Sequence, residues 1–183
     1  MPFPKAILPR FLSALALTGC LVAGFSTTTW AQQSSGFTLF SGVKSENQLP
    51  FQLDYGGKSG IWDRYRLRLP AKRVKLAIAQ IAISYPDYYK GEIDPKAVEI
   101  ALTSGRKVLK KIPIQEVNWD RENRLILIAL KEPIPASSSV EIILSNVRNP
   151  SNVGMYYFNC QIQTPGDVPL LRYIGTWIIT INR

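Results

Sequence analysis

The densest group of side chains that could bind a ligand is basic. Arg64, Arg66 and Arg68 alternate with other residues along the chain, and Lys72 and Arg73 follow closely. In an extended strand, alternate residues project from one face about 6–7 Å apart. Guanidinium groups bind sulfate, phosphate and carboxylate groups through paired hydrogen bonds. The sequence therefore predicts an anion-binding surface. The competing interpretation is a solvated sheet face, or a sheet edge that its charges keep soluble.

A second basic group follows about thirty residues later in the sequence. Its members are Arg106, Lys107, Lys110 and Lys111. A charged turn explains this group, although ligand binding is an alternative.

Three carboxylates and three tyrosines lie in or beside one predicted loop. They are Asp87, Glu92, Asp94, Tyr85, Tyr88 and Tyr89. Two carboxylates are enough to hydrolyse a glycosidic bond, and aromatic rings beside them could line a sugar site. Tyr88 and Tyr89 are therefore candidate ligand contacts. The carboxylate spacing matches no calcium loop, and the alternative is a solvated loop whose tyrosines pack against the domain.

Two absences exclude most common catalytic and metal sites. The sequence has no histidine, which excludes Ser-His-Asp and Cys-His catalysis and histidine metal sites. After residue 31 the sole cysteine is Cys160, so an internal disulfide and a thiolate zinc site are also excluded. The glycine-rich segment 56–60 lacks the spacing of a phosphate-binding loop. We therefore expect no catalytic residue, no cofactor and no metal.

The first 31 residues have the pattern of an export signal. Lys5 and Arg10 precede an apolar stretch from Phe11 to Phe25, which is shorter than the about 20 residues that a spanning helix needs. Cleavage after Ala31 would release a soluble chain, whereas lipidation at Cys20 would anchor it as a lipoprotein. An uncleaved anchor is the third possibility. The predicted location is the periplasm, the thylakoid lumen or the cell surface.

The remainder of the chain is strongly basic. Residues 32–183 hold all 13 acidic residues and all but two of the 22 basic ones. An exported basic domain could bind an anionic polysaccharide, lipid headgroups or an acidic protein, and it could associate peripherally with a membrane. No motif indicates binding to nucleic acid.

The apolar pattern after the leader is that of strands. Apolar and polar residues alternate over 65–69, 98–102, 156–163 and 176–181, whereas 74–85, 125–130 and 140–144 are nearly continuous apolar runs. Seven or eight strands separated by turns, with no long helix, predict an all-β, immunoglobulin-like β-sandwich. We expect residues 32–44 to form a leader or a short edge strand, and 45–183 to form a single domain. Cys160 should face its core.

Two stretches support a resemblance to a known family. One is 65–70 with 74–78, and the other is 147–150 with Gly154, 156–158, 165–167 and 173–176. Over about residues 37–182 the chain resembles a cyanobacterial family of exported proteins known only as a domain of unknown function. The resemblance implies an exported location, and it implies no catalytic residue. The pair Asn149-Pro150 predicts a tight turn.

Together these patterns predict an exported, non-enzymatic binding or structural domain. One alternative is a glycan hydrolase that uses two of the loop carboxylates. Another is an accessory subunit of a membrane or envelope complex, which would need an exposed apolar patch.

Overall fold

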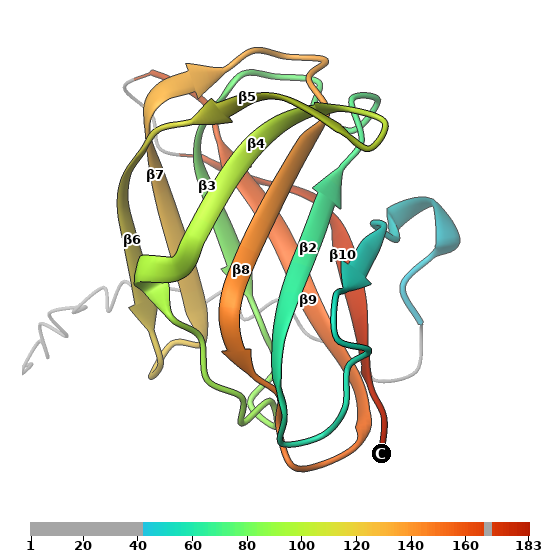
Figure 1. The fold of residues 1–183 in the computed structure, drawn as a ribbon. Coiled ribbons are helices and arrows are strands. Elements are labelled where there is room, and N and C mark those ends of the chain that lie inside the picture. Colours follow the sequence, from blue (N-terminus) through green and yellow to red (C-terminus); the bar gives the residue numbers. More distant parts are fainter. Residues whose placement is uncertain (1–41, 167–169) are drawn as a thin grey trace, which may run out of the picture. The chain divides into compact units, whose positions relative to one another are not determined.

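The structure is a computed structural model, and it describes residues 42–166 and 170–183 (Figure 1). These residues belong to one compact unit that extends from Leu39 to Arg183. The predicted signal peptide, Cys20, Ala31 and the leader up to residue 41 lie outside the described residues, so these assignments stay predictions. No helix in the described part is long and apolar enough to cross a membrane.

Ten strands of the described residues form two antiparallel sheets that face each other (Figure 1). The strand order is β1-β2-β8-β4-β5 in the first sheet and β10-β9-β3-β7-β6 in the second. The strands are Phe51–Leu53 (β1), Trp62–Leu69 (β2), Ile78–Ser84 (β3), Val98–Ser104 (β4), Lys107–Ile112 (β5), Ile114–Asp120 (β6), Leu125–Ile134 (β7), Val140–Arg148 (β8), Gly154–Gln163 (β9) and Leu171–Ile181 (β10). Two short 3-10 helices, Ser45–Asn47 (η1) and Pro95–Ala97 (η2), complete the described elements.

The core lies between the two sheets. It consists of the apolar side chains at alternate positions of the strands, which point inward. Leu67 and Leu69 of β2, Phe158 and Cys160 of β9, and Trp177 of β10 have no exposed surface. Full burial of a large apolar side chain contributes roughly 1.5–3 kcal/mol relative to exposure. The prediction of an all-β sandwich is confirmed, and Cys160 faces the core as expected.

The strand count exceeds the predicted seven or eight. One reason is β5, which the sequence predicts as a charged turn because three of its six residues are lysines. The apolar run at 74–85 contains a shorter strand than expected, since β3 begins only at Ile78. The chain before it turns back on itself, and the Arg73 backbone N–H donates to the Pro70 carbonyl at 2.8 Å.

A bulge shifts the register between β2 and β8. Asp63 pairs with Val147 and Tyr65 with Leu144, so two residues of β8 oppose Arg64. One of them, Asn146, has a φ of 53°, which asparagine tolerates better than most residues. Bulges redirect side chains, and here Asn146 is exposed in the interior of a strand.

A buried carboxylate organises the loop between β1 and β2. Asp63 is only 2% exposed. It accepts hydrogen bonds from the backbone N–H groups of Tyr55 (2.9 Å), Gly57 (2.8 Å) and Arg64 (2.7 Å). The Asn149 side-chain amide lies beside it and donates to the Lys58 carbonyl at 2.8 Å. These bonds offset the cost of burying a charge, so the loop has a defined conformation.

Segments on either side of β1 lie along the outer edge of β10. Gln48 forms a parallel bridge with Thr176, and Lys58 forms one with Asn182. At Gly175 an added Cβ would lie 2.7 Å from a backbone oxygen of η1, so the absence of a side chain permits this close approach. The two sheets are thereby joined along this side of the sandwich.

Candidate functional site

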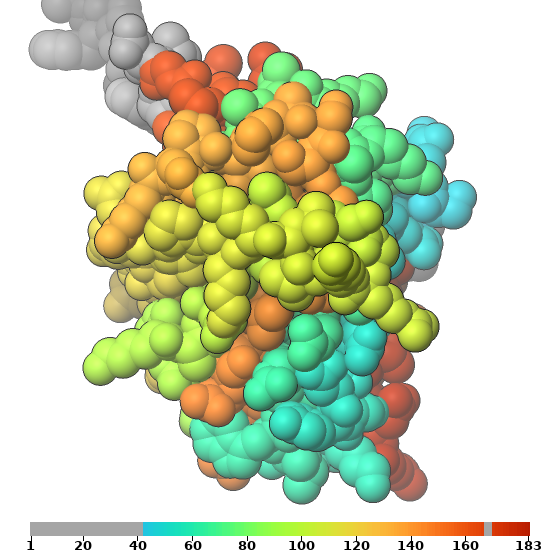
Figure 2. Space-filling model, turned by 45° about the horizontal axis from the view of Figure 1, so that its top comes forward, coloured from blue at the N-terminus to red at the C-terminus, as the bar shows by residue number. Residues whose placement is uncertain are grey.

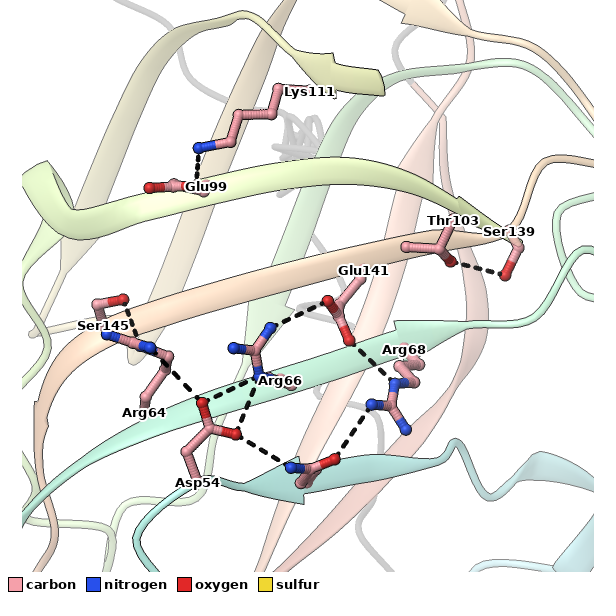
Figure 3. A network of polar contacts seen from close by, with 11 residues as sticks. Asp54, Arg64, Arg66, Arg68, Glu99, Thr103, Lys111, Ser139, Glu141 and Ser145 are labelled. Carbon is pink, nitrogen blue, oxygen red and sulfur yellow. Dashed lines mark hydrogen bonds and ion pairs between the residues drawn. The ribbon is translucent and has the colours of Figure 1, made fainter. Parts of the chain in front are cut away.

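The predicted arginine row lies on the outer face of the first sheet, where Arg64, Arg66 and Arg68 project from β2 (Figure 3). Two carboxylates lie between the guanidinium groups. Arg66 Nε is 2.9 Å from Asp54 Oδ1, and Arg66 Nη1 is 3.3 Å from Glu141 Oε2. Arg68 Nε is 3.0 Å from Glu141 Oε1. The arginines therefore share a face, as expected, but their charge is used within the protein.

The exposures of these groups show which arginine remains most accessible. The side chains of Asp54 and Glu141 are only 15% and 8% exposed, whereas that of Arg64 is 39% exposed. Arg64 reaches Asp54 only at 3.7 Å and donates through Nε to Ser145 Oγ. The hydrogen bond to Asp54 is the main cause that raises the pKa of Arg66. The row thus links β1, β2 and β8, and Arg64 is its most available member.

The other two predicted cations lie elsewhere, at one end of the sandwich. Lys72 and Arg73 are in the connection between β2 and β3, together with Lys75, and Arg172 lies near the start of β10. None of these four side chains forms an ion pair with another described residue. We call this group of four the basic end. The β2–β3 connection and the residues around the β9–β10 connection lie close together in the space-filling view (Figure 2).

A surface depression of about 420 Å³ lies within the basic end. Its cations are Arg73, Lys75 and Arg172, and its apolar lining includes Leu76 and Tyr173. Leu76 is 39% exposed and Tyr173 is 47% exposed. No acidic side chain of the described residues lines this depression. The site therefore combines unpaired positive charge with exposed apolar surface.

The sequence alone does not identify Arg172 of the basic end or Tyr173 of its depression. Arg172 and Tyr173 lie about a hundred residues after Arg73, and neither belongs to a charged cluster. The signal that could have found them is topological. Adjacent antiparallel strands β3 and β9 place the β2–β3 and β9–β10 connections at the same end.

The predicted tyrosine contacts have different surroundings. Tyr89 is 3% exposed, and its ring packs edge-on against Phe158 with the centroids 4.9 Å apart. It is a core residue and cannot meet a ligand at the surface, which corrects the expectation for this side chain. Tyr88 is 49% exposed and rests on Tyr156. It lies outside the basic end.

The loop carboxylates also separate. Glu92 and Asp94 line a second depression, of about 510 Å³, whereas Asp87 does not. Asp94 accepts hydrogen bonds from the Lys96 backbone N–H at 2.9 Å and from the Asn146 amide at 3.3 Å. Within the described residues no cluster of acidic, histidine or cysteine side chains could hold a metal ion.

The second basic cluster is partly paired. Lys110 forms an ion pair with Glu132, and Lys111 forms one with Glu99 at 2.7 Å (Figure 3). These exposed pairs contribute little to stability. They do, however, reduce the positive charge of β5 that is available to a partner.

Comparison of the sequence with family models gives one informative match. The model described as "Protein of unknown function (DUF2808)" matches residues 37–181. This range covers most of the chain, and it confirms the predicted resemblance to a domain of unknown function. A comparison with curated proteins finds no match.

Several solved structures are similar in the arrangement of their strands. The collagen-binding domain of a Staphylococcus aureus adhesin is 12% identical with a TM-score of 0.43, covering 74% of this chain and 97% of that chain. The collagen-binding subdomain of the Enterococcus faecalis surface protein ACE is 8% identical with a TM-score of 0.42, covering 72% and 95%. A Nocardia farcinica protein described as having an immunoglobulin-like fold is 8% identical with a TM-score of 0.39, covering 74% and 99%. Similarities of this size say nothing about what this chain binds.

Proposed function

Because the chain belongs to the DUF2808 family, whose description assigns no activity, we propose a function from the geometry of the domain. It is an exported, non-enzymatic binding domain that docks on an anionic lipid surface through the basic end. The observation that carries the proposal is that Arg73, Lys75 and Arg172, which form no ion pair with another described residue, line a depression together with exposed apolar side chains, and that Lys72 lies beside them in the chain.

Charge alone would suit an anionic polysaccharide equally well, so the apolar side chains decide between the partners. Leu170 and Leu171 are 59% and 44% exposed and lie beside Arg172, while Leu76 and Tyr173 line the depression itself. At a bilayer interface, leucine gains by leaving water, and tyrosine places its ring among the headgroups. A polysaccharide offers no comparable apolar phase. The combination therefore favours lipid.

The export part of the proposal rests on the N-terminal pattern of residues 1–31. After export, the domain would face a membrane leaflet, and the anionic lipid headgroups of that leaflet would be its accessible partner. A cyanobacterial origin, which the family resemblance implied, stays a prediction. The arginine row has a smaller role than the sequence suggested, because Asp54 and Glu141 occupy most of its charge.

The test compares the full chain with a variant that carries Arg73→Ser, Lys75→Ser and Arg172→Ser. Each basic residue near an anionic surface contributes about 1 kcal/mol. We therefore expect the variant to partition on the order of 100-fold more weakly onto vesicles in which about a third of the lipid is phosphatidylglycerol. Cosedimentation measures the partitioning, and pure phosphatidylcholine vesicles report the contribution of the N-terminal apolar stretch.

The matched control changes Lys58, Lys90 and Lys96 to serine. These exposed lysines lie at the other end of the sandwich, Lys58 and Lys90 in connections between strands and Lys96 in η2, and their replacement removes the same total charge. A control that loses as much binding as the test variant would show a general charge effect and contradict the proposal. The variant Leu76→Ser separates the partners. Unchanged vesicle binding, together with charge-dependent retention on dextran sulfate, would assign the site to polysaccharide.

A further inference from the structure

The depression that Glu92 and Asp94 line lies at the opposite end of β2 from the basic end. We infer that it is a saccharide-binding site for an uncharged or amino sugar unit of a glycan. This site is independent of the lipid-docking surface and uses a different set of residues.

The dimensions of the depression suit a small ligand. It has a volume of about 510 Å³ and is lined by Trp62, Glu92, Ile93, Asp94, Arg121 and Asn146. Pockets that hold small molecules span roughly 300–1,000 Å³ and combine apolar walls with a few placed polar groups. Ile93, which is 3% exposed, provides a buried apolar floor.

Trp62 is the residue that points to a sugar. Its side chain is 54% exposed at the first position of β2, whereas Trp177 has no exposed surface and serves the core. An exposed indole is a large, rigid apolar face with a hydrogen-bond donor at its edge. The C–H face of a pyranose ring stacks on such a surface, while its hydroxyl groups project sideways toward polar neighbours.

The polar neighbours are held in position by contacts that the protein itself supplies. The backbone of Glu92 exchanges two hydrogen bonds of 2.9 Å with that of Arg148, the residue of β8 that pairs with Trp62. Asp94 is held by the Lys96 N–H and by the amide of Asn146. Because the backbone of Glu92 and the carboxylate of Asp94 are held before binding, a ligand does not have to supply the free energy of ordering them.

Arg121 closes the set from the turn between β6 and β7. Its guanidinium carbon lies 4.0 Å from the centroid of the Trp119 ring, a stacked arrangement that restrains an otherwise exposed side chain. The guanidinium group, two carboxylates and an amide offer donors and acceptors for vicinal hydroxyl groups.

The charges of the lining residues select among sugars. Two carboxylates face one guanidinium, so the depression carries an excess of negative charge. Uronic acids and sulfated sugars would therefore be repelled, whereas uncharged and amino sugars would not. This preference is the reverse of that of the basic end, so the two surfaces cannot share one ligand.

The test is a calorimetric titration of the full chain with a chitin-derived trisaccharide, with maltotriose, and with a galacturonic acid trimer as the acidic comparison. We expect one of the two uncharged sugars to bind with a Kd between about 0.1 and 10 mM, and the acidic sugar not to bind. Trp62→Ala should weaken binding at least about tenfold and Asn146→Ala about threefold. Trp62→Phe, which keeps an aromatic face, should recover part of the loss.

Tyr55→Ala is the matched control, because Tyr55 is 59% exposed and does not line the depression. This variant should bind as the wild type does, as should the triple variant of the basic end. The inference is wrong if neither uncharged sugar binds at about 10 mM. It is equally wrong if Trp62→Ala, shown to be folded by its circular-dichroism spectrum, binds with wild-type affinity.

Discussion

Replacing Asp63 by alanine should destabilise the domain far more than the loss of an exposed carboxylate would. The Asp63 carboxylate is the acceptor for three backbone N–H groups, of Tyr55, Gly57 and Arg64. Gly57 is buried, so water cannot replace the lost acceptor there. Gly57 also has a φ of 66°, and an added Cβ would lie 2.8 Å from the Thr180 carbonyl oxygen, so this stretch of the loop has little room to rearrange.

The size of the effect follows from counting these groups. An orphaned buried N–H costs about 1–3 kcal/mol, and the two partly exposed groups lose about 0.5–1 kcal/mol each when water replaces the carboxylate. The total is about 3 kcal/mol. In a domain of about 150 residues this corresponds to a fall in Tm of roughly 6–12 °C.

The measurement is urea unfolding followed by tryptophan fluorescence, to which buried Trp177 contributes, together with a thermal melt. The matched control is Asp87→Ala, which removes an exposed carboxylate from the β3–β4 loop and should stay within about 0.5 kcal/mol of the wild type. If Asp63→Ala were as stable as that control, the carboxylate would not organise the loop and the reasoning would fail.

Three further outcomes follow from the structure. Arg66→Ser should lower the free energy of unfolding by about 1–2 kcal/mol, because Asp54 and Glu141 lose their shared partner while staying largely buried; an unchanged urea midpoint would contradict this. Burial raises the pKa of the Cys160 thiol and of the Tyr65 hydroxyl, so a thiol reagent should label Cys160 only in the unfolded protein. Both groups stay protonated in the folded protein, whereas in the unfolded protein they ionise above pKa values of about 8.5 and 10. Their contribution to the free energy of unfolding is therefore complete below these values and is lost as the pH rises above them. A urea midpoint that stays constant up to about pH 11 would refute this.

The sequence was sufficient for the fold wherever burial alternates with exposure. In β2 and β9 the period of two is strict, so the inward face, including Cys160, could be assigned in advance. It was not sufficient for β5, because its three lysines and three apolar residues do not alternate with a period of two. For the run at 74–85 the sequence predicted too long a strand. Val74 is fully buried and therefore apolar, although it lies in a turn before the strand.

The candidate sites depended more strongly on tertiary structure. Charge density predicted both Lys72 and Arg73 and the arginine row as ligand contacts, but the register that places Glu141 opposite Arg68, and so pairs the row internally, cannot be read from the sequence. The motif Asn149-Pro150 predicted a turn, whereas the Asn149 side chain is buried and accepts a hydrogen bond of 2.5 Å from the Tyr65 hydroxyl. Trp62 was overlooked although it shares the outward parity of Arg64, Arg66 and Arg68 in β2, so strand alternation could have indicated its exposure.

The segments that flank β1 have a consequence for how copies of this protein meet one another. They protect the outer edge of an eleven-residue strand, β10, and an unprotected edge of that length is a template for pairing with another chain. Proteolytic trimming up to residue 50 would unmask the backbone of β10 beside Thr176. The same domain would then accept a strand from a second molecule, so that two trimmed copies would pair through their β10 edges.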